Sequence, residues 1–263
     1  MKGIIGAICG DIIGSTREFN PLKTKDFELI TKYSTFTDDT VLTLAIASWL
    51  TNDDEHYSKN LVKEIQKLTR NYPFIGYGGR FKNWINSDNP QPYGSWGNGS
   101  AMRVSPVAWI CDSLEETQIL AKKSAEVTHN HPEGIKGAVA TASAIYLARN
   151  NNKKEFIRDY VEETFNYDLS RQLDDIREDY RFEVSCQKSV PESIICFLES
   201  DSYEDTIRNA VSLGGDADTM GAIGGSIASA FYNVPENIVS ECTSRLDNNL
   251  LRIFEKYNNK FFN

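Results

Sequence analysis

Apolar residues recur at helical spacing over most of this chain. The clearest runs are Asp39–Leu50, Glu133–Arg149 and Asp218–Tyr232, in which apolar side chains return every three or four residues. Alternation of apolar and polar residues, which would indicate half-buried strands, is nearly absent. The pattern therefore predicts an all-α fold. The many Gly, Ala and Ser residues of the third run would allow another backbone to approach closely, so we expect that helix to be central.

Weaker periodic segments predict further helices over Tyr57–Asn71, Leu114–Val127, Val190–Leu198, Tyr203–Leu213 and Glu236–Asn248. Two segments rich in Gly, Pro, Asn and aromatic residues, Tyr72–Gly79 and Ser87–Gly99, predict ordered loops near a site. The charged and irregular residues 150–183 favour peripheral helices or a variable lid. Since no repeat or low-complexity linker divides the sequence, we expect one domain over residues 1–263.

An acidic cluster, Thr37-Asp38-Asp39-Thr40, stands at the start of the first predicted helix. Capping explains part of it, because Thr and Asp at a helix N-terminus accept hydrogen bonds from free backbone N–H groups and complement the helix dipole. Capping does not require all four residues. The cluster is therefore open to two interpretations, a helix cap and a ligand-binding site.

A second acidic cluster, Asp216-Ala217-Asp218-Thr219, follows Gly214-Gly215 and also opens a predicted helix. The glycines allow the backbone to bend so that both carboxylates face one centre. Neither cluster has a His or Cys beside it, so both offer hard oxygen ligands, which suit Mg²⁺ or Mn²⁺ better than zinc. Together the two clusters predict a divalent metal centre.

Two glycine-bearing segments are candidates for contact with an anionic ligand. In Gly97–Arg103 the residues Asn98, Gly99 and Ser100 precede what resembles a helix start, where exposed backbone amides favour a pyrophosphate; a simple tight turn is the alternative. In Tyr72–Arg80 the residues Tyr77, Gly78 and Gly79 would cover a phosphate while an aromatic ring stacks on a base.

Two of the three histidines, His129 and His131, precede Pro132 at the start of a predicted helix. Either side chain is placed to hydrogen-bond a ligand phosphate or ribose. The alternative is structural, a histidine that fixes a buried turn.

Charge and composition exclude several classes of function. The net charge of -9 argues against binding to a nucleic-acid backbone, which needs concentrated Lys and Arg. Without a long apolar window or a secretory signal, we expect a cytoplasmic protein that does not bind membranes. Five scattered cysteines without a C-x-x-C pair indicate reduced thiols rather than disulfides or a zinc site.

These motifs together resemble the ADP-ribosylglycohydrolase family, which includes the dinitrogenase reductase-activating glycohydrolases and the ADP-ribosylarginine and ADP-ribosylserine hydrolases. The resemblance runs nearly end to end and is carried by Gly6–Asp11, Phe36–Thr40, Gly97–Arg103, Thr128–Gly134 and Gly214–Gly221. It implies a compact, mostly orthogonal all-α fold with two Mg²⁺ or Mn²⁺ ions at the bottom of a cleft. Its implied metal ligands are Thr37, Asp38, Asp39, Asp216, Asp218 and Thr219.

The resemblance also implies a reaction, hydrolysis of the glycosidic bond of ADP-ribosylated proteins or small molecules with ADP-ribose as product. Two cations would orient the ribose and a water molecule. A carboxylate would act as general base or stabilise an oxocarbenium-like state, and Glu18, seven residues after Asp11, is the first candidate, with Asp38 and Asp216 as the others. An exposed loop carboxylate is the alternative interpretation of Glu18.

Two other functions remain open at this point. Paired Asp clusters with two Mg²⁺ ions also serve metal-dependent phosphatases and nucleotide hydrolases. A non-catalytic ADP-ribose-binding protein is the third possibility, although the intact acidic motifs argue against it. The linkage is not determined by the sequence; we rank ADP-ribosylarginine before serine, nucleobase and metabolite linkages.

Overall fold

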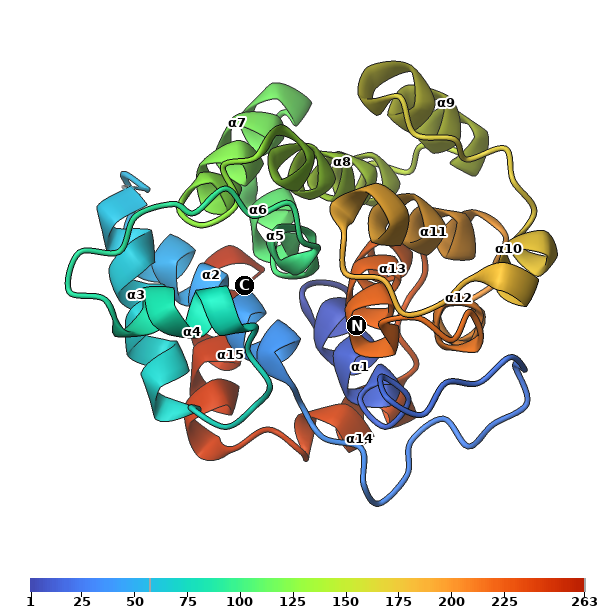
Figure 1. Ribbon diagram of the computed structural model, residues 1–263, viewed down its shortest axis with the longest axis horizontal. Coiled ribbons are helices and arrows are strands. Elements are labelled where there is room, and N and C mark those ends of the chain that lie inside the picture. Colours follow the sequence, from blue (N-terminus) through green and yellow to red (C-terminus); the bar gives the residue numbers. More distant parts are fainter. Residues whose placement is uncertain (57, 263) are drawn as a thin grey trace.

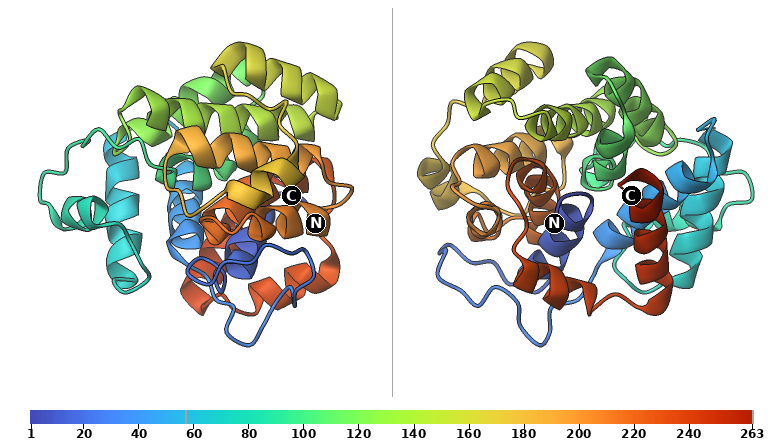
Figure 2. Two further views of the ribbon diagram at one scale, coloured as in Figure 1. Left: turned by 45° about the vertical axis from the view of Figure 1, so that its right-hand side comes forward. Right: turned by 180° about the vertical axis from the view of Figure 1, so that it is seen from behind.

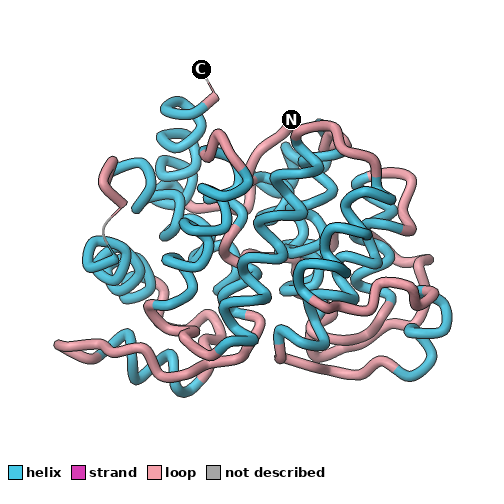
Figure 3. The backbone as a smooth tube through the Cα atoms, turned by 90° about the horizontal axis from the view of Figure 1, so that it is seen from above, coloured by secondary structure: helices cyan, strands magenta, loops and turns pink. Residues whose placement is uncertain are grey.

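The computed structural model describes residues 1–56 and 58–262, and their regular structure is helical apart from one isolated bridge between Gly97 and Ser185. Figure 3 shows the helices packed together and the longer irregular segments gathered along one edge of the molecule. The predicted all-α class is confirmed. No helix within the described residues has both the length and the apolar character needed to cross a membrane.

Helix α13 (Ala217–Phe231) lies at the centre, and four helices make the most extensive contacts with it. Figures 1 and 2 show α1 beside it, with α8, α11 and α12 on its other sides. These neighbours span Ile5–Gly14 (α1), Pro132–Arg149 (α8), Cys186–Leu198 (α11) and Tyr203–Ser212 (α12). Every residue of α13 except its last, Phe231, is buried, as its small-residue sequence predicts.

The remaining helices complete two outer groups. On one side α2 (Asp38–Asn52) packs against α3 (Ser58–Asn71), α6 (Ser105–Ile110) and α15 (Asn248–Phe261), and α4 (Gly79–Asn86) covers α3. The others are α5 (Gly99–Met102), α7 (Leu114–Glu126), α9 (Lys154–Phe165), α10 (Leu173–Asp179) and α14 (Glu236–Thr243). Helices α9 and α10 lie at the periphery in Figure 1, which agrees with the predicted position of residues 150–183.

Glycine residues lie at the contact between helices α1 and α13 and allow the two backbones to approach closely. A Cβ atom added to Gly221 would lie 2.5 Å from the carbonyl oxygen of Gly10, and one added to Gly225 would lie 2.5 Å from that of Gly6. Both distances are too short for a carbon, so only glycine permits this separation of the two helices. The hydroxyl of buried Tyr203 on α12 donates to the carbonyl oxygen of Gly6 at 2.8 Å and ties a third helix to the contact.

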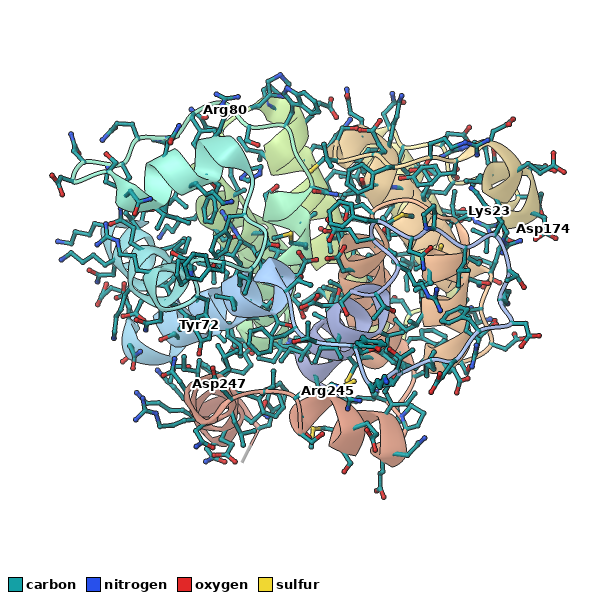
Figure 4. The ribbon with its side chains drawn as sticks, turned by 60° about the horizontal axis from the view of Figure 1, so that its bottom comes forward. Lys23, Tyr72, Arg80, Asp174, Arg245 and Asp247 are labelled. Atoms are coloured by element: carbon teal, nitrogen blue, oxygen red, sulfur yellow. The ribbon has the colours of Figure 1, made fainter. Side chains whose placement is uncertain are left out.

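Hydrogen bonds from Arg and Lys side chains fix the irregular segment between α1 and α2, residues 15–37; Arg245 and Lys23, two of these side chains, are labelled in Figure 4. Arg208 donates to the carbonyl oxygens of Lys25 and Phe27, and Arg245 donates to those of Thr31 and Ser34. In the opposite direction, Lys23 Nζ donates to the carbonyl oxygens of Arg177, Tyr180 and Leu213 at 2.6–2.7 Å. These bonds replace the backbone pairing that a regular element would supply.

Most predicted helices are present with small changes at their ends. The Val190–Leu198 prediction is too short, because α11 begins at Cys186, whose N–H donates to the carbonyl oxygen of Trp96 at 3.0 Å. The Glu236–Asn248 prediction is wrong beyond Thr243, since Asp247 accepts from the N–H groups of Asn249 and Leu250 and starts α15. The predicted start at Tyr57 lies outside the described residues. All five cysteines are buried and free.

Candidate metal centre and ligand cleft

A cleft of about 430 Å³ opens between the two acidic helix starts. Its volume is within the usual range of small-molecule sites. One part of its wall is acidic and consists of Glu18, Asp38, Asp39, Asp216 and Asp218. The rest of the lining includes glycines and aromatic residues together with Arg80, Arg103 and His129. The cleft therefore has an acidic region and a region with cationic and neutral donors.

The acidic region is assembled from three segments. Asp38 and Asp39 form the first turn of α2, Asp216 and Asp218 stand at the start of α13, and Glu18 comes from the loop after α1. One carboxylate oxygen each from Glu18, Asp216 and Asp218 lies within 4.8 Å of the other two. Sequence positions about 200 residues apart thus meet at one point, as a shared metal site requires.

The environment strongly disfavours five ionised carboxylates in the absence of a cation. Burial, followed by repulsion from Asp218 and Asp11, raises the pKa of Glu18 and of Asp38 to about 8 each. Burial raises the pKa of Asp216 to about 6, and it raises those of Asp39 and Asp218 well above the ordinary value. Among the described residues, none of the five forms an ion pair with Lys or Arg.

These residues fit a divalent cation. Asp39 Oδ2 is buried without a hydrogen-bond partner, although a buried carboxylate oxygen normally has one. Hard oxygen donors without thiolate or imidazole are the set that Mg²⁺ and Mn²⁺ prefer. A cation at this position would relieve both the repulsion and the unsatisfied oxygen.

Thr37 is used as the N-cap of α2, one of the two roles that the sequence left open. Its Oγ1 accepts from the N–H of Asp39 at 3.3 Å and donates to Asp11 Oδ1 at 2.7 Å. Thr37 does not line the cleft, whereas Thr219 does. The Thr219 hydroxyl donates to Asp39 Oδ1 at 3.4 Å and so connects the two acidic clusters.

The two glycine-bearing loops lie on the cleft wall, but not all of their predicted residues face it. Gly78, Gly79, Asn98 and Gly99 line the cleft. Tyr77 is buried and packs edge-on against Phe81, with ring centroids 5.5 Å apart. The hydroxyl of buried Ser100 donates to the carbonyl oxygen of Gly134 at 2.6 Å and serves packing rather than a ligand.

The two histidines separate into different roles. His129 is buried and lines the cleft, with its ring 6.2 Å from that of Tyr93. His131 does not line it. Its Nδ1 accepts from the N–H of Glu133 at 3.2 Å, so His131 is the N-cap of α8, which corresponds to the structural interpretation rather than the predicted ligand contact.

Comparison with known proteins identifies the family. The family model of the ADP-ribosylglycohydrolases matches residues 1–261. The chain belongs to the ADP-ribosylglycohydrolase family. It is 27% identical to the mouse ADP-ribosylhydrolase ARH3 over 288 residues, with 84% of this chain and 78% of the mouse protein covered. It is 24% identical to the ADP-ribosylarginine hydrolase Tri1 of Pseudomonas putida, with 88% of this chain and 70% of that protein covered.

A solved structure of an ADP-ribosylglycohydrolase-related protein complex has the same fold, with a TM-score of 0.73 at 21% identity. The structural match covers 97% of this chain and 95% of the chain in that solved structure. The chain is thus a glycohydrolase of this family, and its enzyme class agrees with the prediction from the sequence.

One residue near the site, Asp11, was not recognised from the sequence, and Asn98, which was predicted to contact a ligand, also has a partner that the sequence did not indicate. Asp11 is fully buried on α1 and accepts from the N–H groups of Thr37 and Thr40, each at 3.0 Å, so it orients the start of α2. Asn98 donates to Asp216 Oδ2 at 2.8 Å and to Ser189 Oγ at 3.3 Å. The signal for Asp11 was a carboxylate within an otherwise apolar helix, whereas nothing local connects Asn98 with Asp216.

Proposed function

We propose that this glycohydrolase cleaves the bond between the anomeric carbon of ADP-ribose and its acceptor, with ADP-ribosylarginine as the preferred substrate. The observation that carries the proposal is the meeting of Glu18, Asp216 and Asp218 at the acidic region of a cleft whose remaining wall offers Arg80, His129 and glycine backbone. An anionic diphosphate complements the second region. The name of the Pseudomonas relative, an ADP-ribosylarginine hydrolase, supports the choice of arginine.

The metal ligands in this proposal are the cleft-lining side-chain oxygens of Asp38, Asp39, Asp216, Asp218 and Thr219, with Thr37, whose hydroxyl oxygen also caps α2, as the sixth. Two Mg²⁺ or Mn²⁺ ions bound there would orient the ribose hydroxyls and acidify water. Asp11 and Asn98 keep the α2 start and Asp216 in place through the hydrogen bonds described above.

Glu18 is assigned the proton-transfer role. Water adds to the anomeric carbon, the bond to the acceptor breaks with its electron pair on the acceptor, and Glu18 takes the proton that the water loses. Glu18 lies within 4.8 Å of Asp216 and Asp218 in the acidic region, and its loop position leaves it free of capping duties. Glu18 then passes this proton to the acceptor, which leaves protonated, and ADP-ribose is released.

The test is a panel of ADP-ribosylated arginine, serine, nucleobase and small-metabolite substrates, with free ADP-ribose and inorganic phosphate measured separately. We expect ADP-ribose release, fastest from arginine, which is abolished by chelator and restored by Mg²⁺ or Mn²⁺ but not by zinc. Asp218→Asn is the inactive control. Phosphate without ADP-ribose would identify a phosphatase or nucleotide hydrolase, and tight ADP-ribose binding without turnover would identify a binding protein.

A further inference from the structure

Arg103 is a fully buried cation directly behind the cleft wall. Among the described residues it forms no ion pair with a carboxylate, and its Nε has no hydrogen-bond partner. Its Nη2 donates to the carbonyl oxygen of Ser124 at 3.1 Å and to Thr128 Oγ1 at 2.7 Å. Arginine only donates, so Thr128 Oγ1 must accept in this bond.

The proton of the Thr128 hydroxyl then has two acceptors within reach. One is His129 Nδ1 at 2.7 Å, and the other is the carbonyl oxygen of Ala125 at 3.5 Å. That carbonyl oxygen already accepts from the backbone N–H groups of His129 at 2.8 Å and Thr128 at 3.1 Å, which uses both of its lone pairs. The hydroxyl proton therefore belongs to the short bond with His129 Nδ1.

A His129 ring that accepts at Nδ1 and is neutral carries its proton on Nε2. Burial and the nearby Arg103 guanidinium both lower the pKa of His129, and the other titratable group against the ring is the phenol of Tyr93. The Nε2 edge faces the glycine loop: a Cβ atom added to Gly99 would lie 3.2 Å from Nε2, and one added to Gly97 would lie 3.8 Å from it.

We infer that Arg103 and Thr128 are positioning residues that hold His129 in one tautomer, so that its Nε2–H donates to the anionic group seated at Gly97–Gly99. That this group is the diphosphate of ADP-ribose rests on the proposed function. Arg103 also places an unpaired positive charge behind the same loop. A fixed neutral donor is useful here, because it binds an anion without the reorganisation that a rotating or titrating side chain would require.

The tautomer is measured directly by nitrogen-15 NMR of histidine side chains in the full-length protein with Mg²⁺ at about pH 7. His129→Asn identifies the His129 signals by their loss. The expected result is an Nε2–H tautomer in the wild type and in Thr128→Ser, and a mixed or inverted tautomer in Thr128→Val, which has the same shape without the hydroxyl. An Nδ1–H tautomer or an imidazolium in the wild type would overturn the inference.

Ligand affinity provides the second measurement. Thr128→Val should weaken both ADP-ribose and ADP by about tenfold, and adenosine far less, whereas Thr128→Ser should bind like the wild type. Equal affinities in all three proteins, with ADP-ribose still bound, would overturn the donor role and leave the proposed function intact. If the wild type binds no ADP-ribose, the proposed function fails, and with it the diphosphate assignment, whatever the tautomer.

Discussion

Glu18 differs from the aspartates around it because it belongs to a loop rather than to a helix start. Asp38, Asp39 and Asp218 are fixed in first turns, where their backbones cannot adjust independently, and Asn98 restrains Asp216. Glu18 is half-buried in a bend of the segment 15–37. A loop carboxylate that caps no helix is available to move a proton, while the carboxylates at the helix starts are suited to holding a cation.

Glu18→Gln should lower kcat by about 100-fold while ADP-ribose affinity changes by less than about twofold, because the lost interaction is made chiefly in the transition state. Both quantities are measured on one ADP-ribosyl substrate and its product. Glu28→Gln, an exposed carboxylate of the same loop, is the control and should retain normal kcat. A near-normal kcat in Glu18→Gln would transfer the role to Asp38 or Asp216.

At the scale of elements, two sets of contacts hold the site together. One is the glycine contact between α1 and α13, and the other is the set of hydrogen bonds that Lys23, Arg208 and Arg245 make at the 15–37 loop. The first sets the distance between the helix that carries Asp11 and the one that begins at Asp216 and Asp218. The second determines where Glu18 lies. Each can be disturbed without touching a cleft residue.

Gly221→Ala should destabilise the protein by about 3 kcal/mol or more, because the added carbon meets the Gly10 backbone, which cannot move without separating two buried helices. Chemical denaturation of this variant and of its control measures the free energy of unfolding. Gly78→Ala is the matched control, since a carbon there has no neighbour within 4 Å; its free energy of unfolding should stay within ~0.5 kcal/mol of the wild type. Equal effects at both positions would refute the close-packing argument.

Lys23→Met should lower kcat by about tenfold with little change in thermal stability, because three carbonyl oxygens lose their donor and the loop that carries Glu18 loosens. Limited proteolysis should cut residues 15–37 faster in this variant. Lys25→Met removes only a partly exposed ion pair with Asp205 and should behave like the wild type. If the two variants are alike, Lys23 does not position the loop.

The sequence predicted the elements better than their junctions. Helices such as α2 and α8 followed from apolar spacing, and the two acidic clusters could be located because each opens a helix. The start of α15 depends on Asp247 as an N-cap within a run that otherwise continues helically. The roles of Ser100 and His131 depended on partners that tertiary packing or the local cap supplied, so residue type alone assigned them to the ligand.

At the scale of the whole molecule, the acidic cluster couples stability to pH and, under the proposed function, to bound metal. In the cation-free protein the folded pKa values of Glu18 and Asp38, about 8 each, exceed the ordinary values of 4.5 and 3.8. The folded state therefore keeps protons that the unfolded chain releases. This contribution to stability is complete below about pH 4 and is lost as the pH rises to about 8.

With chelator present, the melting temperature should fall by at least about 5 °C between about pH 5 and pH 8, and Mg²⁺ should reverse most of that fall. Asp38→Asn removes one titrating group, so its chelated form should show a shallower fall and melt no lower than the chelated wild type at the higher pH. Scanning calorimetry across the pH series measures both effects. A chelated wild type that gains stability with pH, or an Asp38→Asn variant that melts much lower, would mean that the aspartates act mainly as helix caps.

The glycine contact between α1 and α13 can form only after both helices have been synthesised. Helix α1 is translated before α13, and the α13 surface that buries it follows roughly 200 residues later. During that interval an apolar helix has left the ribosome without its partner and is exposed to other chains and to chaperones. The start of α2 can form early, but the carboxylates of Asp216 and Asp218 reach it only after the whole segment between α2 and α13 has been made. Under the proposed function, the complete set of metal ligands therefore exists only after the start of α13 has been made.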